Sequence, residues 1–120
     1  MDEVCRQLPI NRGNIAVMGM SDGGSLGLSM ALRNPSLFRT ALVQAVGFFV
    51  DARGDRAAKP RIFLEYGAKD RLFTPEAVAR PLCARLESAG YSVEFSMVPE
   101  AGHMVREEFF ATAMNFWLRE

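Results

Sequence analysis

An excess of charge of either sign is absent from this chain, as are long hydrophobic runs and clusters of cysteine. The 120 residues include 14 Lys and Arg and 14 Asp and Glu, so the formal net charge is zero. Without a basic cluster, electrostatics gives no reason to expect nucleic acid or an anionic membrane surface as a partner. No apolar run approaches the roughly 20 residues that span a bilayer, so we expect no membrane-embedded segment.

The two cysteines, Cys5 and Cys83, are too few for a disulfide framework. We expect two reduced thiols that pack as small apolar side chains. The start of the chain, Met1 to Val4, is acidic where a signal peptide would be positively charged. We therefore predict a cytoplasmic protein, and we expect neither a metal nor another cofactor. The length and the 49% hydrophobic content fit one globular domain over residues 1–120.

The most informative motif of the sequence lies in the stretch from Val17 to Ser25. An apolar run stops at Gly19, Ser21 follows two residues later, and Gly23 precedes an amphipathic run. This Gly-x-Ser-x-Gly pattern is typical of a nucleophile elbow, a sharp turn from a strand into a helix with a strained serine at its apex. We expect both glycines to be needed because a side chain there would collide with the turn. A glycine-rich turn with an incidental serine fits so short a pattern about as well, so the rest of the chain must supply a base and an acid.

Apolar periodicity predicts α/β layers with a parallel sheet. A short helix closed by Pro9 is expected at the start, and residues 47–60 are expected to form an irregular crossover between two parallel strands. The apolar faces of the last two helices are expected to include Ala77 and Phe110, respectively. We predict about four parallel strands (14–19, 39–46, 61–66 and 92–98) flanked by helices (23–33, 75–89 and 105–118).

Three polar residues follow the predicted strands: Ser21 after the first, Asp70 after the third and His103 after the fourth. The carboxyl ends of parallel strands share one edge, so we expect these side chains to meet there. A serine hydroxyl becomes a nucleophile when an imidazole takes its proton, and a carboxylate fixes the imidazole tautomer. Taken alone, Asp70 is equally typical of a solvated turn, and His103, the only histidine, of a surface loop. The order Ser, Asp, His is that of α/β-hydrolases and favours a catalytic triad.

Three other acids compete with Asp70 for the place beside His103. Glu65 lies inside a predicted strand, Asp55 lies in the irregular segment, and Glu100 is close to His103 in sequence. Asp70 is preferred because it alone follows the end of a strand at a suitable distance along the chain.

Residues from about 14 to 118 resemble the C-terminal half of an α/β-hydrolase of the esterase/lipase superfamily. The resemblance implies a truncated α/β-hydrolase fold. The resemblance implies Ser21 as nucleophile, His103 as general base and Asp70 as the acid that orients it. It also implies that the backbone N–H of Asp22, at a helix N-terminus, is one oxyanion donor. The segments that carry it are the elbow (15–24), a helix end similar to esterase-D-like and depolymerase-like members (31–39), the acid loop (66–70) and the histidine loop (101–103).

The sequence departs from this family in several respects. Met20 stands where the family often has an aromatic residue or histidine, and an acidic Asp22 beside the serine disfavours anionic substrates. The family has about four further strands before the elbow strand, and a loop among them supplies the second oxyanion donor. No lid domain is expected, because residues 47–60 are too few. The strand at 15–18 is then an apolar edge with unpaired backbone groups, so we expect a homodimer that joins through it.

The predicted function is that of a serine carboxylic-ester hydrolase, which acts on small-molecule short-chain acyl esters through an acyl-enzyme intermediate. Thioesterase, peptidase and depolymerase activities use the same triad, so the natural substrate stays open. The alternative is a non-catalytic or weakly active hydrolase fragment that serves as a folding or assembly module. The candidate residues of the substrate pocket are Met20, Phe48, Phe73 and Met104. Core packing explains Phe48, Phe73 and Met104 as well as substrate binding does.

Overall fold

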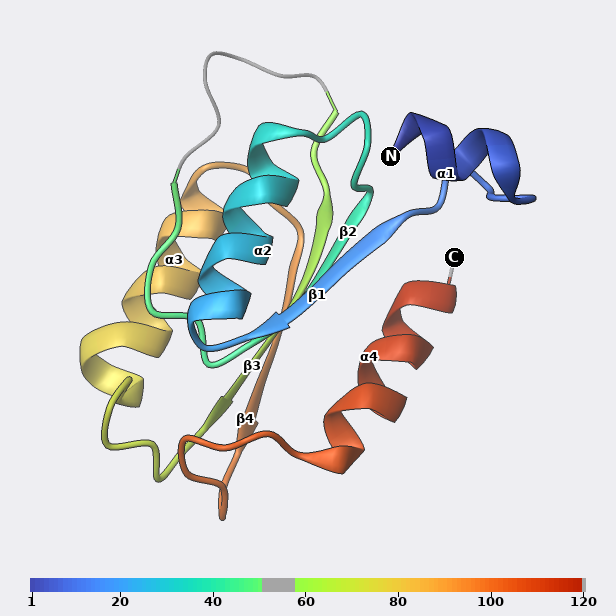
Figure 1. Ribbon diagram of the computed structural model, residues 1–120. Helices are drawn as coiled ribbons and strands as arrows, with labels where there is room; N and C mark the ends of the chain where they lie inside the picture. The colour runs from blue at the N-terminus through green and yellow to red at the C-terminus, as the bar shows by residue number, and fades with distance from the viewer. Residues whose placement is uncertain (51–57, 120) are drawn as a thin grey trace.

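The computed structural model describes residues 1–50 and 58–119, and it has one parallel sheet with helices on both faces (Figure 1). The predicted strands and helices are confirmed, with ends that differ from the prediction by at most two residues. The strands are β1 (Ala16–Met20), β2 (Thr40–Gln44), β3 (Arg61–Gly67) and β4 (Val93–Val98). The helices are α1 (Asp2–Gln7), α2 (Asp22–Arg33), α3 (Arg80–Ser88) and α4 (Glu107–Leu118), and a π-helical turn, η1 (Pro75–Ala79), leads into α3.

The four strands lie in chain order across the sheet, β1-β2-β3-β4, and all neighbours are parallel. The carboxyl ends of all four strands therefore lie at one end of the sheet. β1 lies at an edge, with Ala16 opposite Thr40 and Met20 opposite Gln44 of β2. Within residues 1–50 and 58–119, no strand pairs with the outer side of β1, as expected for this apolar segment.

Helices α2 and α3 cover one face of the sheet and α4 covers the other (Figure 1). Leu28 of α2 and Leu86 of α3 are wholly buried in the larger core. On the opposite face, the rings of Phe109 and Phe116 lie 5.8 and 5.6 Å from that of Phe63. Full burial of an apolar side chain contributes about 1.5–3 kcal/mol, so these two layers are the main stabilising contacts of the sheet. Among the described residues, none of the helices has both the length and the apolar content of a membrane span.

Small residues let α2 approach the sheet closely. A β-carbon at Gly24 would lie 2.9 Å from the carbonyl oxygen of Gln44, and one at Gly27 would lie 3.3 Å from the Val17 side chain. Ala31 is wholly buried on the same helix. The start of α2 is thereby held against the ends of β1 and β2, next to the serine that precedes it.

The buried face of the segment before α3 differs from the prediction. Ala77 is exposed, and Ala79 is buried instead. The Ala79 N–H bonds to the carbonyl of Thr74, five residues back, at 3.1 Å, which is the π-helical pattern. The prediction for Ala77 was wrong because this wider turn breaks the 3.6-residue period on which it relied.

The apolar face of α4 was also predicted too broadly. Phe109, Ala113 and Phe116 are buried against the sheet, whereas Phe110 is 60% exposed. Neighbouring residues of a helix point about 100° apart, so Phe110 cannot share the contact that Phe109 makes. The expectation that Phe110 is buried was wrong.

Residues 46–50 have no regular structure, as expected for the crossover after β2. Two serines of α2 hold this segment: Ser25 Oγ accepts from the N–H of Gly47 at 2.9 Å, and Ser29 Oγ accepts from the N–H of Val50 at 2.9 Å. The remainder of the predicted crossover, including Asp55, lies largely outside the described residues.

Candidate active site

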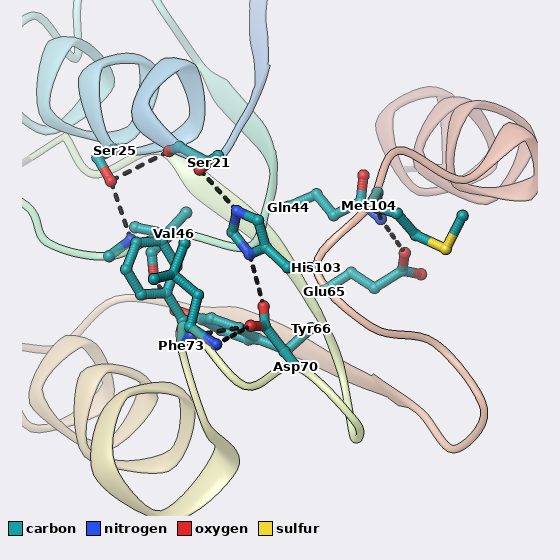
Figure 2. Close-up of polar contacts among 12 residues, drawn as sticks. Ser21, Ser25, Gln44, Val46, Glu65, Tyr66, Asp70, Phe73, His103 and Met104 are labelled. Carbon is teal, nitrogen blue, oxygen red and sulfur yellow. Dashed lines mark hydrogen bonds and ion pairs between the residues drawn. The ribbon is translucent and has the colours of Figure 1, made fainter.

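The three side chains predicted to meet do so at the carboxyl ends of the strands (Figure 2). Ser21 follows β1, Asp70 follows β3, and His103 follows β4. Ser21 Oγ lies 2.9 Å from His103 Nε2, and His103 Nδ1 lies 2.7 Å from Asp70 Oδ2. In the tautomer with its proton on Nδ1, His103 donates to Asp70 and its Nε2 accepts from the Ser21 hydroxyl. One hydrogen-bonded chain therefore connects the ends of three strands.

The serine sits on a strained turn. Ser21 has φ of 56°, in the left-handed region that residues with a side chain rarely adopt. Its N–H donates to the Gln44 carbonyl at 2.8 Å, which fixes the apex to the end of β2. A β-carbon at Gly19 would lie 2.3 Å from the Gly23 carbonyl oxygen, so only glycine fits there.

The steric need for the second glycine was misplaced. A β-carbon at Gly23 would meet no atom within 4 Å, whereas one at Gly24 would lie 2.9 Å from the Gln44 carbonyl oxygen. Close approach to β2 therefore requires glycine at 24 and not at 23. The Gly-x-Ser-x-Gly pattern identifies this turn, but its last position is not the one that the packing constrains.

The N-terminus of α2 begins directly after Ser21. The Ser25 N–H bonds back to the Ser21 carbonyl at 2.8 Å, so the amides of the preceding turn have no intrahelical partner. The backbone N–H of Asp22 is the first of these amides. Free N–H groups at a helix start favour negative charge nearby, and this one lies next to the Ser21 hydroxyl along the chain.

Asp70 is 2% exposed, and its two oxygens have separate tasks. Oδ1 accepts from the backbone N–H groups of Leu72 and Phe73, both at 2.8 Å. Oδ2 is left to accept from His103. Because two main-chain donors fix the carboxylate, it presents one oxygen to the imidazole in a defined direction.

The His103 ring is held by an aromatic contact as well. Its side chain is 22% exposed, and the Phe73 ring meets it edge-on, with centroids 5.1 Å apart and planes at 84°. Phe73 also fills the space beside Gly47, where a β-carbon would lie 2.6 Å from its ring. Phe73 therefore packs between the crossover segment after β2 and the histidine.

The sequence matches no protein-family model, and no curated protein matches it. The structure does match solved structures. The carboxylesterase of Bacillus cereus superposes with a TM-score of 0.75 at 21% identity, over 97% of this chain and 54% of that chain. Esterase PE8 gives 0.78 at 18% identity, over 96% and 54%. MGS-M1, an alpha/beta hydrolase from a deep-sea metagenome library, gives 0.76 at 18% identity, over 96% and 57%.

The chain has part of the α/β-hydrolase fold. It spans about half the length of the solved chains it matches, which agrees with the predicted truncated fold. At 18–21% identity the likeness speaks for the fold alone. The sheet order, the helices on both faces and the sharp turn after β1 are the features that the α/β-hydrolase fold accounts for.

The predicted pocket residues have unequal places around this site. Phe73 contacts the His103 ring. Met20 is half-buried at the end of β1, whereas Phe48 and Met104 are each 56% exposed. The structure thus brings one of the four against the Ser21–His103–Asp70 chain and leaves two largely open to solvent.

The competing acids have other partners. Glu65 is 1% exposed and pairs with Arg106, and the exposed Glu100 pairs with Lys69 at 2.7 Å. Asp55 lies outside the described residues. Across the part of the chain that the structure describes, no group of three or more His, Cys, Asp or Glu side chains is arranged to hold a metal ion.

A second polar cluster, made of Gln44, Glu65 and Arg106, lies beside this site and was not predicted from the sequence. Glu65 was considered only as a rival acid. A signal was present, because Glu65 interrupts the otherwise apolar run of β3, and a buried carboxylate requires a partner. Nothing in the sequence pattern indicates which basic residue pairs with this carboxylate.

Proposed function

We propose that this chain is a serine carboxylic-ester hydrolase that acts on short-chain acyl esters. The observation that supports the proposal best is the hydrogen-bonded chain from Ser21 through His103 to Asp70, with distances of 2.9 and 2.7 Å. These distances lie in the range in which a nucleophile, a base and an orienting acid work together. The esterases among the similar structures agree with this assignment.

In the proposed reaction, Ser21 Oγ attacks the ester carbonyl carbon while its proton passes to His103 Nε2. Asp70 keeps the Nδ1 proton in place and stabilises the imidazolium that forms. The imidazolium then protonates the leaving alcohol, and an acyl-serine remains. Water, deprotonated by His103, attacks the acyl carbon and releases the carboxylic acid and free Ser21.

The tetrahedral intermediates carry negative charge on the former carbonyl oxygen. We assign the Asp22 N–H as one donor to this oxyanion, because it is unpaired within the helix and adjacent to the nucleophile. Loss of one such donor lowers a rate by about 10²–10³. The Asp22 side chain lies in the same turn and opposes anionic substrates, which favours neutral esters.

The acyl group of the substrate is proposed to lie against Met20, Phe48, Phe73 and Met104. Phe73 carries most weight in this assignment, because its ring touches the base directly. The half-buried Met20 lies next to Ser21 in sequence. An acyl chain in contact with these side chains would bury apolar surface at about 25 cal/mol per Å².

The outer side of β1 supports a related proposal, a homodimer joined through residues 15–18. Within the described residues no strand pairs with this side, and its Met18 is 40% exposed. An apolar edge without charge invites pairing with another strand, and a two-fold axis would place two β1 strands antiparallel. A partner loop could then provide a second oxyanion donor. Sedimentation at micromolar concentration tests the dimer, and a monomer would contradict it.

Hydrolysis of p-nitrophenyl acetate tests the proposed activity. The wild-type protein should turn over the ester, and Ser21→Ala should fall to the background rate. The exposed Ser36 offers a matched control, because Ser36→Ala removes a hydroxyl away from the site and should leave the rate unchanged. Equal rates for wild type and Ser21→Ala would contradict the proposal and favour the non-catalytic alternative. A burst without turnover would mean that acylation proceeds and deacylation does not.

A further inference from the structure

A buried polar cluster joins the ends of β2 and β3 to the segment before α4. It consists of Gln44, Glu65 and Arg106, which we call the Gln44 cluster. Arg106 Nη2 donates to Glu65 Oε1 at 3.0 Å, and Arg106 Nε donates to Glu65 Oε2 at 3.2 Å. Gln44 Nε2 donates to the same Oε2 at 3.1 Å. Both oxygens of a carboxylate that is 1% exposed are therefore satisfied.

Gln44 connects this cluster to the backbone segments that carry Ser21 and His103. Its carbonyl oxygen accepts from the Ser21 N–H at 2.8 Å. Its Nε2 also donates, at 3.3 Å, to the carbonyl of Met104, the residue after His103 (Figure 2). One residue of β2 thus holds the apex of the elbow through its main chain and the histidine loop through its side chain.

The histidine loop is anchored on both sides of His103. Before the histidine, the carbonyl of Ala101 accepts from the Lys69 N–H at 2.9 Å, which ties the loop to the segment that carries Asp70. After it, Met104 is tied to Gln44, and Arg106 is tied to Glu65. The pKa of Arg106 is raised, mainly by its hydrogen bonds to Glu65, so the guanidinium stays charged and the second anchor persists.

Stability alone gives a poor account of these polar groups. A buried ion pair often contributes less than apolar side chains of similar volume would. In addition, Gln44 Oε1 is buried and has no hydrogen-bond partner among the described residues. An unsatisfied buried acceptor costs about 1–3 kcal/mol, so an apolar residue at position 44 would remove a penalty. What the amide adds is a fixed link between two segments.

We propose that Gln44, Glu65 and Arg106 are positioning residues, which set the distance between Ser21 and His103 by fixing the elbow and the histidine loop to one frame. The inference rests on the proposed ester hydrolysis for its kinetic consequence. None of the three touches the reacting atoms. Their effect is on the geometry of His103 and therefore on the chemical step, not on substrate binding.

Gln44→Met separates this role from stability. Methionine has a similar length, removes the unpaired Oε1, and removes the link to Met104 while the Gln44 carbonyl keeps its bond to Ser21. We expect the thermal midpoint to change little and kcat for p-nitrophenyl acetate to fall about 10–100-fold, with KM within about twofold, because small misplacements of a base are costly in rate.

Two further variants accompany this test, one that should act in the same way and one that is a control. Glu65→Gln keeps the shape but turns one acceptor into a donor that faces Arg106 or Gln44, so it should lower kcat in the same way. Glu100→Gln is the control, because Glu100 also lies beside the histidine loop but belongs to an ion pair with Lys69 that is exposed to solvent. Its kcat and KM should equal those of the wild type.

Proton NMR of His103 provides a readout that does not depend on activity. As the only histidine, His103 gives ring signals that need no assignment, including the low-field N–H signal of an imidazole bonded to a carboxylate. This signal should broaden or shift in Gln44→Met and Glu65→Gln and stay unchanged in Glu100→Gln. If the wild type hydrolyses no ester, the proposed function fails, and the NMR comparison still decides the positioning role.

Several outcomes would overturn the inference. One is an unchanged His103 signal in a folded Gln44→Met protein. Another is a kcat for this variant within about twofold of wild type, well short of the loss expected for a misplaced base. If Gln44→Met does not fold, Glu65→Gln carries the same test. Failure of both to fold would show that the cluster is structural.

Discussion

Two buried carboxylates lie five positions apart, Glu65 in β3 and Asp70 just after it, and they have opposite kinds of partner. They are 1% and 2% exposed. Glu65 pairs with Arg106, whose guanidinium keeps its charge at any physiological pH, and Asp70 pairs with His103, whose second ring nitrogen lies 2.9 Å from Ser21 Oγ. Burial is the same for both carboxylates, so burial does not tell which of them can take part in proton transfer.

The way each carboxylate is held completes the contrast. Backbone N–H groups fix one oxygen of Asp70, while side chains of Gln44 and Arg106 supply all the bonds described for the Glu65 carboxylate. The first arrangement aims a single oxygen at a titratable base. The second forms an ion pair with a guanidinium, which does not release a proton. A candidate catalytic acid therefore differs from a positioning acid in its partner, an imidazole or a guanidinium. It also differs in having one oxygen that no other group occupies.

The largest effect is expected from removal of the hydrogen bond between Asp70 and His103. In Asp70→Asn, an amide replaces the oxygen that accepts from His103 Nδ1, so the imidazole loses the tautomer that leaves Nε2 free. We expect kcat for p-nitrophenyl acetate to fall about 10³–10⁴-fold, as when a triad aspartate becomes asparagine. The far-ultraviolet circular dichroism spectrum should stay that of the wild type. A loss of less than tenfold would mean that Asp70 does not orient the base.

Removal of the ion pair between Glu65 and Arg106 should mainly lower the free energy of unfolding. Arg106→Met leaves a fully buried carboxylate without its counter-charge, and removal of one partner of a buried pair is destabilising by about 3–5 kcal/mol. We expect the lower end, about 3 kcal/mol, because the Arg106 side chain is 19% exposed and water already reaches part of the pair. Urea unfolding measures this change. A loss below about 1 kcal/mol would show that Glu65 finds water or another donor.

A substitution between the two carboxylates should disturb the side that carries His103. A β-carbon at Gly67 would lie 2.3 Å from the Ala101 carbonyl oxygen, so Gly67→Ala must push the histidine loop away from β3. We expect a destabilisation of about 1–3 kcal/mol, typical of overpacking. Ester hydrolysis should also fall, because the displaced loop carries the base. In the unfolding measurement, Gly23→Ala is a control for the added methyl group, since a β-carbon there meets no atom within 4 Å.

The smallest effect is expected at an exposed ion pair near the same loop. Lys69→Met removes the partner of Glu100, and the two side chains are 64% and 83% exposed. Exposed pairs contribute about 0–1 kcal/mol, so the urea midpoint should move little. Rising salt concentration should reduce even this difference. A change as large as that of Arg106→Met would contradict the view that burial gives the Glu65 pair its importance.

Much of the fold could be predicted because its signals are local. The apolar run that ends at Gly19 and the amphipathic run that follows Gly23 each occupy a few neighbouring residues. The same holds for the serine turn, whose strain at Ser21 follows from a short pattern. Predictions failed where a local period was extended too far: the π-helical turn buries Ala79 in place of Ala77, and α4 leaves Phe110 exposed.

The order of Ser21, Asp70 and His103 along the chain, together with the ends of the strands they follow, was enough to predict that they meet. This worked because parallel strands carry their carboxyl ends to one edge, whatever the details of packing. The roles assigned to these residues remain proposals for the experiments above. Glu65, in contrast, appeared only as a rival acid, and Gln44 and Arg106 carried no signal of their own.

The sequence by itself determined the alternation of strands and helices, the elbow around Ser21 and the set of residues at the strand ends, because these depend on periodicity, glycine sterics and chain order. Only the tertiary structure decided that Glu65 pairs with Arg106 and that Gln44 donates to the same carboxylate. Hydrogen bonds of 2.7 to 3.2 Å require loops from distant parts of the chain to be placed within fractions of an ångström. That placement comes from the packing of whole elements, and no local pattern encodes it.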